Sequence, residues 1–365
     1  MRARTRLAML AVVVLAIAVA LAIYFLLQQP PAPRPPGTPA ATTSSWYEIY
    51  FTAPVYPDRP ETRKGGLDER LVQFVDTAQK SVDAADYDFD LANVADALAR
   101  ARRRGVQVRF VTDTDTWTSD NPEVRAAWSI LKQAEIPVVD DQRQPIMHHK
   151  FMVVDGEWVW TGSWNWTVGD TYRLNNHAVK IRSPELAADY TAEFERMFVQ
   201  RQFGDRKRAG SPRPRLTIGG AAVESYFAPK DPIAQRIVDR VGAAASSVQF
   251  LAFSFTHDGI GQAMIARHQA GIPVRGVFET TGSQTRFSEF GRLKSAGLEV
   301  YTDGNPYAMH HKVIVIDGRT AVFGSFNFST NAADDNDENI LFVDDPTLAA
   351  AFLAEIDRLV AQAKK

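Results

Sequence analysis

Residues 148–167 read HHKFMVVDGEWVWTGSWNWT, and residues 310–329 read HHKVIVIDGRTAVFGSFNFS. Both stretches follow the pattern His-x-Lys-x4-Asp-x6-Gly-Ser-x-Asn, and each matched position lies 162 residues from its counterpart. Upstream, residues 81–113 parallel residues 247–279 at an offset of 166. Self-similarity over such a length indicates an internal duplication, and a surface loop readily absorbs a length change of four residues.

Each copy is expected to contain the same order of elements. A β-type run comes first, and an amphipathic helix and a glycine-bounded strand follow it. A second helix and a short strand then lead to the motif. In the second copy, the first run, the glycine-bounded strand and the second helix are expected at residues 248–255, 272–278 and 288–295. This order predicts an α/β fold of two duplicated lobes, each a mostly parallel sheet with helices on both faces.

Breaks in composition divide the chain further. We predict a membrane anchor at residues 1–28, a Pro-rich stalk at 29–45, a first lobe at 46–203, a basic linker at 204–217 and a second lobe at 218–365. Extended Pro-rich segments act as spacers.

The N-terminal segment is typical of an uncleaved transmembrane helix. Arg2, Arg4 and Arg6 precede an uncharged apolar run at residues 7–27, which is long enough to span a bilayer. The positive-inside rule predicts a cytoplasmic N-terminus and a body outside the cytoplasm. Cleavage as a signal peptide, followed by secretion, is the alternative.

The composition excludes several kinds of chemistry. The chain contains no cysteine, which rules out disulfides, thiol catalysis and thiolate metal sites. The formal net charge is -2, so no strong overall attraction to nucleic acid or anionic lipid is expected, although a local basic cleft stays open.

The alternation of a strand makes each motif a coherent chemical unit. Residues two apart share a face, so His148 and Lys150 project together, as do His310 and Lys312. A phosphodiester carries one negative charge, which a neutral imidazole can approach without repulsion. A second, protonated imidazole can donate to the departing oxygen, while ammonium and amide groups hold the phosphate oxygens. Two such motifs supply these groups without a metal or other cofactor.

At these residues the chain resembles the phospholipase D superfamily, whose members are often called HKD proteins. The resemblance covers nearly everything from Trp46 to the C-terminus. It implies that one motif histidine forms a phosphohistidine while the other acts as acid and then base. It assigns catalysis to His148, His310, Lys150, Lys312 and Glu338, phosphate binding to Asn165, Asn327, Ser163 and Ser325, and structural roles to Asp155, Asp317 and Asn176.

The resemblance also implies a carboxylate for each histidine, and here the copies differ. In many relatives, a glutamate about eleven residues after the motif Asn bonds the histidine of its own motif. The second copy has Glu338 there, and the first has Asn176. On this basis we expect His310 to be the protonated acid and His148 the nucleophile, with reduced activity left open by Asn176.

Neighbouring residues have simpler interpretations. His149 and His311 are expected to be packed or to support the site, and His257 could lie at a substrate edge. The tryptophans of the first motif are expected to pack in the core, with a stacking or membrane-wetting stripe as the alternative. They are Trp158, Trp160, Trp164 and Trp166.

The anchor favours a hydrolase acting on phospholipid headgroup esters. The alternatives are an endonuclease cleaving DNA or RNA, a transferase of the cardiolipin synthase kind, and a tethered binding protein without activity. Since both motifs lie in one chain, a monomer is expected to complete one site.

Overall fold

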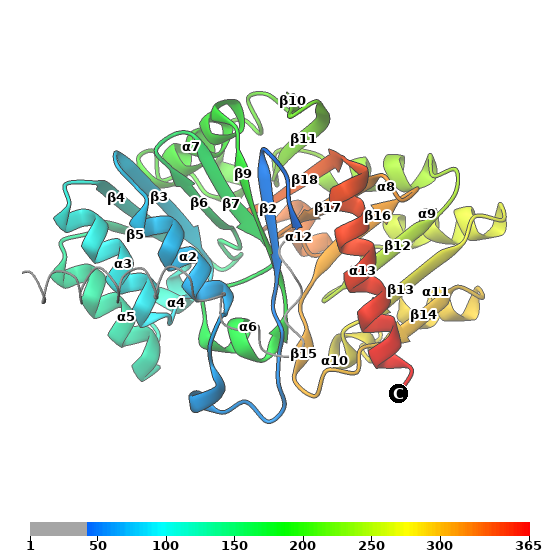
Figure 1. Cartoon of the computed structure of the whole chain (residues 1–365). Helices are drawn as coiled ribbons and strands as arrows, with labels where there is room; N and C mark the ends of the chain where they lie inside the picture. Colours follow the sequence, from blue (N-terminus) through cyan, green and yellow to red (C-terminus); the bar gives the residue numbers. More distant parts are fainter. Residues whose placement is uncertain (1–41) are drawn as a thin grey trace, which may run out of the picture. The chain divides into compact units, whose positions relative to one another are not determined.

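The computed structural model describes residues 42–365, which belong to one compact unit. Their strands form two eight-stranded sheets of the same plan and one two-stranded sheet (Figure 1). The first sheet contains, in spatial order, β1 (Thr42–Thr43), β2 (Tyr47–Phe51), β9 (His177–Arg182), β7 (Trp158–Gly162), β6 (Lys150–Val154), β3 (Ser81–Asp86), β4 (Gln107–Thr112) and β5 (Val138–Asp140). The second contains β10 (Arg215–Ile218), β11 (Ala221–Ala228), β18 (Glu338–Asp344), β17 (Thr320–Gly324), β16 (Lys312–Ile316), β12 (Val248–Ala252), β13 (Val274–Phe278) and β14 (Glu299–Thr302). The short sheet joins β8 (Leu174–Asn175) to β15 (Ala308–Met309).

Helices cover both faces of each sheet, as predicted. The longer helices are α2 (Leu67–Asp76), α3 (Ala92–Arg103), α5 (Pro122–Gln133) and α7 (Pro184–Phe198) in the first half, and α8 (Ile233–Gly242), α9 (Asp258–Gln269), α11 (Phe290–Ser295) and α13 (Pro346–Ala363) in the second. Short helices are η1 (Pro60–Thr62), α4 (Thr114–Trp117), α6 (Val168–Tyr172), η2 (Gly204–Arg206), α10 (Thr280–Ser283) and α12 (Thr330–Asp334). Helices α2, α3 and α5 pack on one face of the first sheet, and α8, α9 and α11 on one face of the second.

The remaining faces of the two sheets share one core. Helix α7 packs on the first sheet and α13 on the second, and the apolar side chains of both helices and both sheets form a single cluster. Phe352 of α13 contacts Phe51 of the first sheet, with ring centroids 5.7 Å apart. Tyr190 of α7 contacts Phe227 of the second sheet at 5.0 Å. The two sheets are thus joined by buried apolar surface, which stabilises their association.

The prediction of mostly parallel sheets is wrong. In the first sheet only β3–β4 and β4–β5 are parallel, and in the second only β12–β13 and β13–β14. The other five neighbouring pairs of each sheet are antiparallel. For β6–β7 and β16–β17 the reason is local: each motif strand continues through a tight turn into the next strand, and only an antiparallel pair can be joined in this way.

The Asp-Gly pair of each motif makes that turn. Asp155 and Asp317 have φ of 57° and 55°, in the left-handed region that Asp and Gly tolerate. The Asp155 carboxylate accepts backbone N–H groups of residues 79–81, at 2.7–3.1 Å. Asp317 does the same for residues 245–247. Both carboxylates therefore tie the motif turn to the loop before β3 or β12.

The glycine of each Gly-Ser pair is required because the backbone of the neighbouring strand lies very close to it. A Cβ atom at Gly162 would lie 2.3 Å from the carbonyl oxygen of His177, and one at Gly324 would lie 2.3 Å from that of Asn339. No side chain fits at such a distance. Glycine lets β9 approach β7 and β18 approach β17, and it brings the following serines into the interior.

The ends of the predicted segments are only partly described. The predicted anchor at 1–28 lies outside the described residues, as does the stalk up to residue 41. Residues 42–43 of the predicted stalk form β1, which pairs with β2. Within residues 42–365, none of the helices combines the length and apolar character needed to cross a bilayer. The segment predicted as a linker ends in β10, and its Lys207 is 2% exposed, so it is not solvated throughout.

Candidate active site

The two motifs meet because each is tied to the opposite half of the molecule. The backbone N–H of His148 donates to the carbonyl of Asp337, just before β18, at 2.9 Å. The backbone N–H of His310 donates to the carbonyl of Asn175, at the end of β8, also at 2.9 Å. Each histidine therefore lies beside a strand end in the other half of the molecule, and both residues are buried, with 5% and 6% exposed.

His148 is held by a carboxylate from the second half. Its Nδ1 lies 2.8 Å from both Oε1 and Oε2 of Glu338, which is fully buried at the start of β18. Ser325 donates its hydroxyl to Oε2 of the same carboxylate at 2.6 Å. The carboxylate fixes the ring orientation and directs Nε2 of His148 away from it.

This geometry corrects the expected pairing. We expected Glu338 to bond His310, the histidine of its own motif, but it bonds His148. His310 instead bonds Asn176, with its Nδ1 3.0 Å from Oδ1. The partners are exchanged because the start of β18 and the end of β8 each lie against the opposite motif. The argument that made His310 the protonated acid on account of Glu338 therefore fails.

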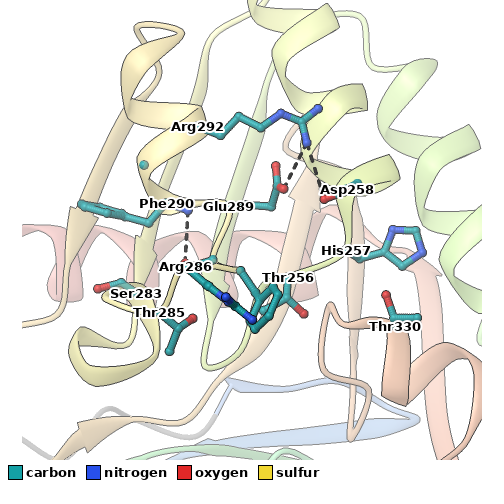
Figure 2. Close-up of a pocket in the computed structure, with 13 residues that line it drawn as sticks. Thr256, His257, Asp258, Ser283, Thr285, Arg286, Glu289, Phe290, Arg292 and Thr330 are labelled. Carbon is teal, nitrogen blue, oxygen red and sulfur yellow. Dashed lines mark hydrogen bonds and ion pairs between the residues drawn. The ribbon is translucent and has the colours of Figure 1, made fainter.

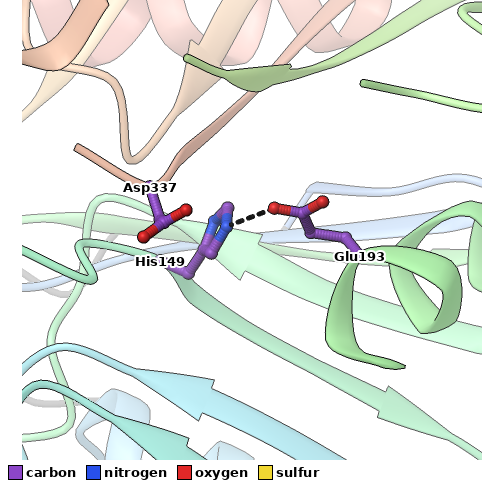
Figure 3. Close-up of side chains that lie close together, drawn as sticks. All are labelled: His149, Glu193 and Asp337. Carbon is purple, nitrogen blue, oxygen red and sulfur yellow. Dashed lines mark hydrogen bonds and ion pairs between the residues drawn. The ribbon is translucent and has the colours of Figure 1, made fainter. Parts of the chain in front are cut away.

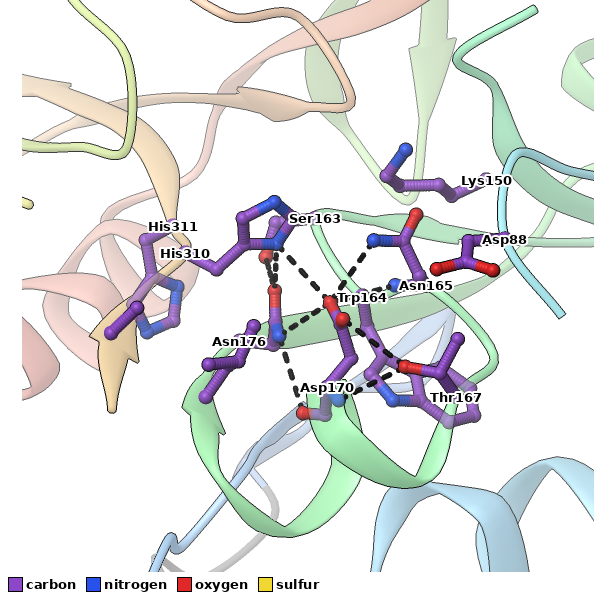
Figure 4. A network of polar contacts seen from close by, with 12 residues as sticks. Asp88, Lys150, Ser163, Trp164, Asn165, Thr167, Asp170, Asn176, His310 and His311 are labelled. Atoms are coloured by element: carbon purple, nitrogen blue, oxygen red, sulfur yellow. Dashed lines mark hydrogen bonds and ion pairs between the residues drawn. The ribbon is translucent and has the colours of Figure 1, made fainter. Parts of the chain in front are cut away.

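His310 has a carboxylate after all, from a residue that the sequence analysis missed. Oδ1 of Asp170, in α6, lies 3.2 Å from Nδ1 of His310 (Figure 4). Asn176 donates its Nδ2 to the same oxygen at 3.0 Å, and Asn165 does so at 3.2 Å. The amide and the carboxylate together occupy the place that Glu338 fills for His148.

A signal for Asp170 was present in the sequence. Thr167 and Asp170 form a capping pair at the start of α6, in which the Thr167 hydroxyl accepts the backbone N–H of Asp170. At the 162-residue offset, the second copy has Ala332 opposite Asp170 and Glu338 opposite Asn176. The carboxylate has thus moved six residues within the first copy, rather than having been lost.

The lysines and motif asparagines line the same buried region. Lys150 and Lys312 are each 1% exposed, and each donates one hydrogen bond to the carbonyl of its own motif histidine, at 2.9 and 2.8 Å. Each ammonium has two further N–H donors. Among residues 42–365, the buried Oδ1 atoms of Asn165 and Asn327 have no hydrogen-bond partner. Both Oδ1 atoms are acceptors, so contact with a bound phosphate would have to come from the Nδ2 groups, of which that of Asn165 already gives one N–H to Asp170.

The motif serines support the histidine partners. Ser163 donates its hydroxyl to Oδ1 of Asn176 at 2.8 Å, as Ser325 does to Glu338. Both serines are fully buried. Their hydroxyl protons are thus directed at the groups that orient the imidazoles, which makes a direct phosphate contact a role we no longer assign to them.

Burial and neighbouring charge shift the titration of the whole cluster. Burial, with the charges of Lys150 and Lys312, lowers the pKa of His148 well below its usual value, and burial with Lys312 lowers that of His310 to about 4. Burial raises the pKa of Glu338 to about 8. Burial also lowers the pKa of both lysines. Burial therefore disfavours the charged forms of these five groups, whereas for Asp170 the neighbouring His310 outweighs burial and lowers the pKa. A bound anion would favour the protonated lysines.

An aromatic ring packs against each histidine. Tyr87 lies 5.1 Å from the His148 ring and 5.2 Å from the Lys150 ammonium. Phe253 lies 4.4 Å from the His310 ring and 4.6 Å from the Lys312 ammonium. These rings exclude water from one side of each His-Lys pair and present a π-face to each lysine, which favours its protonated form against the effect of burial.

The packing interpretation of the intervening residues is confirmed. His149 and His311 are fully buried, and their Nε2 atoms bond Glu193 at 3.1 Å and Glu355 at 3.2 Å. Trp160, Trp164 and Trp166 are at most 1% exposed, so they belong to the core, and Trp158 is half-buried against it. They do not form an exposed stripe.

A pocket of about 770 Å³ opens beside the second motif (Figure 2). Its walls come from the loops after β12 and β13 and from the start of α12. The backbone N–H groups of Thr256 and His257 donate to the carbonyl of Phe328, directly after Asn327. Arg292 bridges Glu289 and Asp258 on one wall, and the Phe287 side chain is 64% exposed.

Comparisons with known proteins agree with this architecture. A family model described as "Cardiolipin synthase, PLD-like domain" matches residues 71–198 and again residues 237–360. The chain belongs to this phospholipase D-like family. The predicted enzyme class, a phosphoric diester hydrolase, is thereby confirmed.

Individual relatives match about half of the chain or less. A mitochondrial cardiolipin hydrolase of Chlamydomonas reinhardtii is 26% identical over 203 residues, which are 49% of this chain and 90% of the relative. The human protein of the same name is 34% identical over 127 residues, which are 35% of this chain and 50% of the relative. The crystal structure of a phosphatidylserine synthase from Haemophilus influenzae has a TM-score of 0.64 at 13% identity, covering 88% of both chains. That likeness shows a shared two-lobed fold.

Proposed function

We propose that this chain hydrolyses phospholipid headgroup esters at a membrane surface through a phosphohistidine intermediate. The observation that carries the proposal is the exchange of partners between the halves, which puts two oriented imidazoles and two ammonium groups in one buried cluster. Cardiolipin is the first substrate to test, because relatives carry the name cardiolipin hydrolase. The predicted N-terminal anchor would hold the site near lipid.

We assign the nucleophile to His148. Attack by its Nε2 on phosphorus forms an N–P bond and makes the ring cationic, and the Glu338 carboxylate at Nδ1 stabilises that cation. The sequence also predicted His148 as the nucleophile, but on the ground that Glu338 would bond His310. Glu338 supports the ring that becomes phosphorylated.

His310 then serves as acid and base. The bound phosphodiester anion favours the protonated His310 ring. As the bond from phosphorus to the leaving oxygen breaks, the electron pair goes to that oxygen, and the imidazolium gives it the proton from Nε2 and becomes neutral. In the second step His310 takes a proton from water, the water oxygen attacks phosphorus, and the N–P bond to His148 breaks. Asp170 and Asn176 orient His310 through Nδ1 in both steps.

The phosphate oxygens would be held by the lysines and the motif asparagines. Lys150 and Lys312 each keep two N–H donors beyond the bond to the carbonyl of the motif histidine, and the Nδ2 groups of Asn165 and Asn327 would add amide donors. Charge-assisted bonds of this kind strengthen as negative charge builds on the oxygens in the transition state.

Lipid and nucleic-acid substrates are separated by one assay. Purified full-length protein is supplied with vesicles of cardiolipin or phosphatidylcholine, and separately with single-stranded DNA and RNA. We expect phosphatidate to be released from vesicles, most rapidly from cardiolipin, in buffer treated with a chelator. Digestion of nucleic acid with vesicles left intact would instead identify a nuclease. His148→Ala protein is the control for contaminating activity.

A further inference from the structure

A buried ionic cluster lies beside the site and plays no part in the mechanism above. His149, Glu193 and Asp337 offer three ligand atoms within 4.8 Å of one another, an arrangement that could hold a metal ion (Figure 3). Its cation is an ammonium group of the chain instead. Nζ of Lys207 lies 2.5 Å from Oε1 of Glu193, 2.8 Å from Oδ1 of Asp337 and 2.7 Å from the carbonyl of Ala228.

This lysine connects three parts of the fold. Glu193 belongs to α7 of the first half, Asp337 immediately precedes β18 of the second, and Lys207 lies in the basic segment between the halves. Burial would discharge an unpaired ammonium, but the charges of Asp337 and Glu193 outweigh it and raise the pKa of Lys207. A fully buried lysine with two carboxylates is costly to break by removing one partner.

Asp337 is the residue through which the cluster reaches the chemistry. Its carbonyl accepts the backbone N–H of His148, and its own N–H donates to the carbonyl of Ile146 at 3.0 Å. Its other carboxylate oxygen accepts Nη2 of Arg143 at 2.6 Å. The next residue is Glu338, so any shift of Asp337 moves the carboxylate that orients His148.

The duplication provides an internal comparison. At the 162-residue offset, Arg143 corresponds to Asn305, Asp337 to Asn175 and Glu338 to Asn176. Asn305 donates to Oδ1 of Asn175 at 2.8 Å and to the carbonyl of Ala308, as Arg143 does to Asp337 and to the carbonyl of Ile146. The contacts are the same, but the Arg143–Asp337 pair beside His148 is charged and the Asn305–Asn175 pair beside His310 is neutral.

Glu193 also has one more cationic partner than the equivalent glutamate of the second copy. Glu193 pairs with Arg196, and its counterpart Glu355 pairs with Arg358. Only Glu193 has a lysine as well. Glu193 and Glu355 are therefore each balanced by an arginine. Lys207 balances Asp337, whose counterpart in the first copy, Asn175, is uncharged.

We infer that Lys207, with Arg143, is a positioning residue for the nucleophile: it neutralises Asp337 and so fixes Glu338 against His148. This inference rests on the proposed hydrolysis. It predicts an effect on the chemical step that leaves phosphate binding intact, because neither cation lies among the groups assigned to the phosphate oxygens.

The test measures kcat and KM on vesicles and on a soluble aryl phosphodiester. We expect Lys207→Ala to lower kcat about a hundredfold, the cost of a small misplacement, with KM unchanged. Methylammonium added to this variant should restore kcat. The control is Lys180→Ala, which removes a lysine paired with Glu48 at 2.7 Å on the first sheet; it should keep kcat and show no response to the amine.

If Lys207→Ala does not fold, a second variant, which copies the equivalent residues of the other half, still tests the inference. Lys207→Ala combined with Arg143→Asn and Asp337→Asn reproduces the neutral Asn305–Asn175 pair beside His310. We expect this triple variant to fold and to recover kcat to within about tenfold of the parent, because the coupled charges are removed together.

Three outcomes would overturn the inference: unchanged kcat in folded Lys207→Ala protein, a raised KM as the main effect, or a triple variant as slow as the single one. An inactive parent protein would count against the proposed hydrolysis instead. In that case NMR of the His148 Nδ1 proton still tests the positioning, since its resonance should shift in Lys207→Ala and return in the triple variant.

Discussion

At the residue scale, His148 and His310 differ in what holds their Nδ1 atoms. Both oxygens of Glu338 face His148, whereas His310 shares an amide and a carboxylate oxygen. Two rings with different partners suit a reaction in which one becomes phosphorylated and the other moves a proton. The duplicated motif supplies both rings, and the residues around it make them different.

Replacement of either histidine is expected to stop turnover. His148→Ala removes the proposed nucleophile and His310→Ala the proton donor, and loss of such a group typically costs about 10²–10⁴-fold in rate. With an activated aryl diester that needs no proton, His310→Ala should still form a phosphoenzyme on His148. Acid quench and peptide mapping of the labelled residue would check this, and label on His310 in the parent enzyme would reverse the roles.

The pH dependence should report on Glu338. Burial raises the pKa of this carboxyl to about 8, so in the free enzyme the group keeps its proton below that pH and loses it above. Loss of the proton frees Nε2 of His148 for attack. We expect kcat/KM to rise with pH along a limb near this value, and Glu338→Gln should lower activity and remove the limb. An unchanged limb in that variant would assign it to another group.

The relocated carboxylate can be tested by moving it back. Asp170→Ala should lower kcat about 10²-fold or more, because His310 loses its charged partner. Combining it with Asn176→Glu copies the arrangement of Ala332 and Glu338 and should restore most of the activity. Failure of the double variant, with its fold intact by circular dichroism, would show that Asp170 acts in some other way.

At the element scale, the aspartates of the two motif turns stabilise the fold and take no part in the proposed chemistry. The Asp155 carboxylate joins the turn after β6 to three backbone N–H groups before β3. Its removal in Asp155→Ala should lower the free energy of unfolding by about 1–3 kcal/mol and leave kcat of the folded enzyme unchanged. Urea denaturation checks the first value. A loss of kcat at full stability would contradict the structural role.

At the scale of the whole molecule, one apolar core spans both sheets through α7 and α13. Separating the halves would expose that surface to water, so the two should unfold together. We expect a single calorimetric transition with equal calorimetric and van't Hoff enthalpies. Two resolved transitions would show instead that the sheets are independent folding units.

The exchange of partners is also a property of the whole molecule. Glu338 and His148 are 190 residues apart, and Asn176 and His310 are 134 apart. A repeat makes the two halves equivalent in sequence, so an offset cannot tell whether a residue serves its own motif or the other one. The packing of the sheets decides it, by bringing β18 to the first motif and β8 to the second.

The sequence by itself determined the duplication, the membership of a phospholipase D-like family and the residues of the two motifs, because these depend on spacing within short segments. It did not yield the direction of most strands, since a run of apolar residues reads alike in either direction, although the Asp-Gly turn was a signal for antiparallel pairing. Only the tertiary structure decided which carboxylate meets which histidine, and showed that Asp170 and Lys207 belong to the same network. Those contacts join segments that are distant along the chain, and only the shared core brings them within hydrogen-bonding distance.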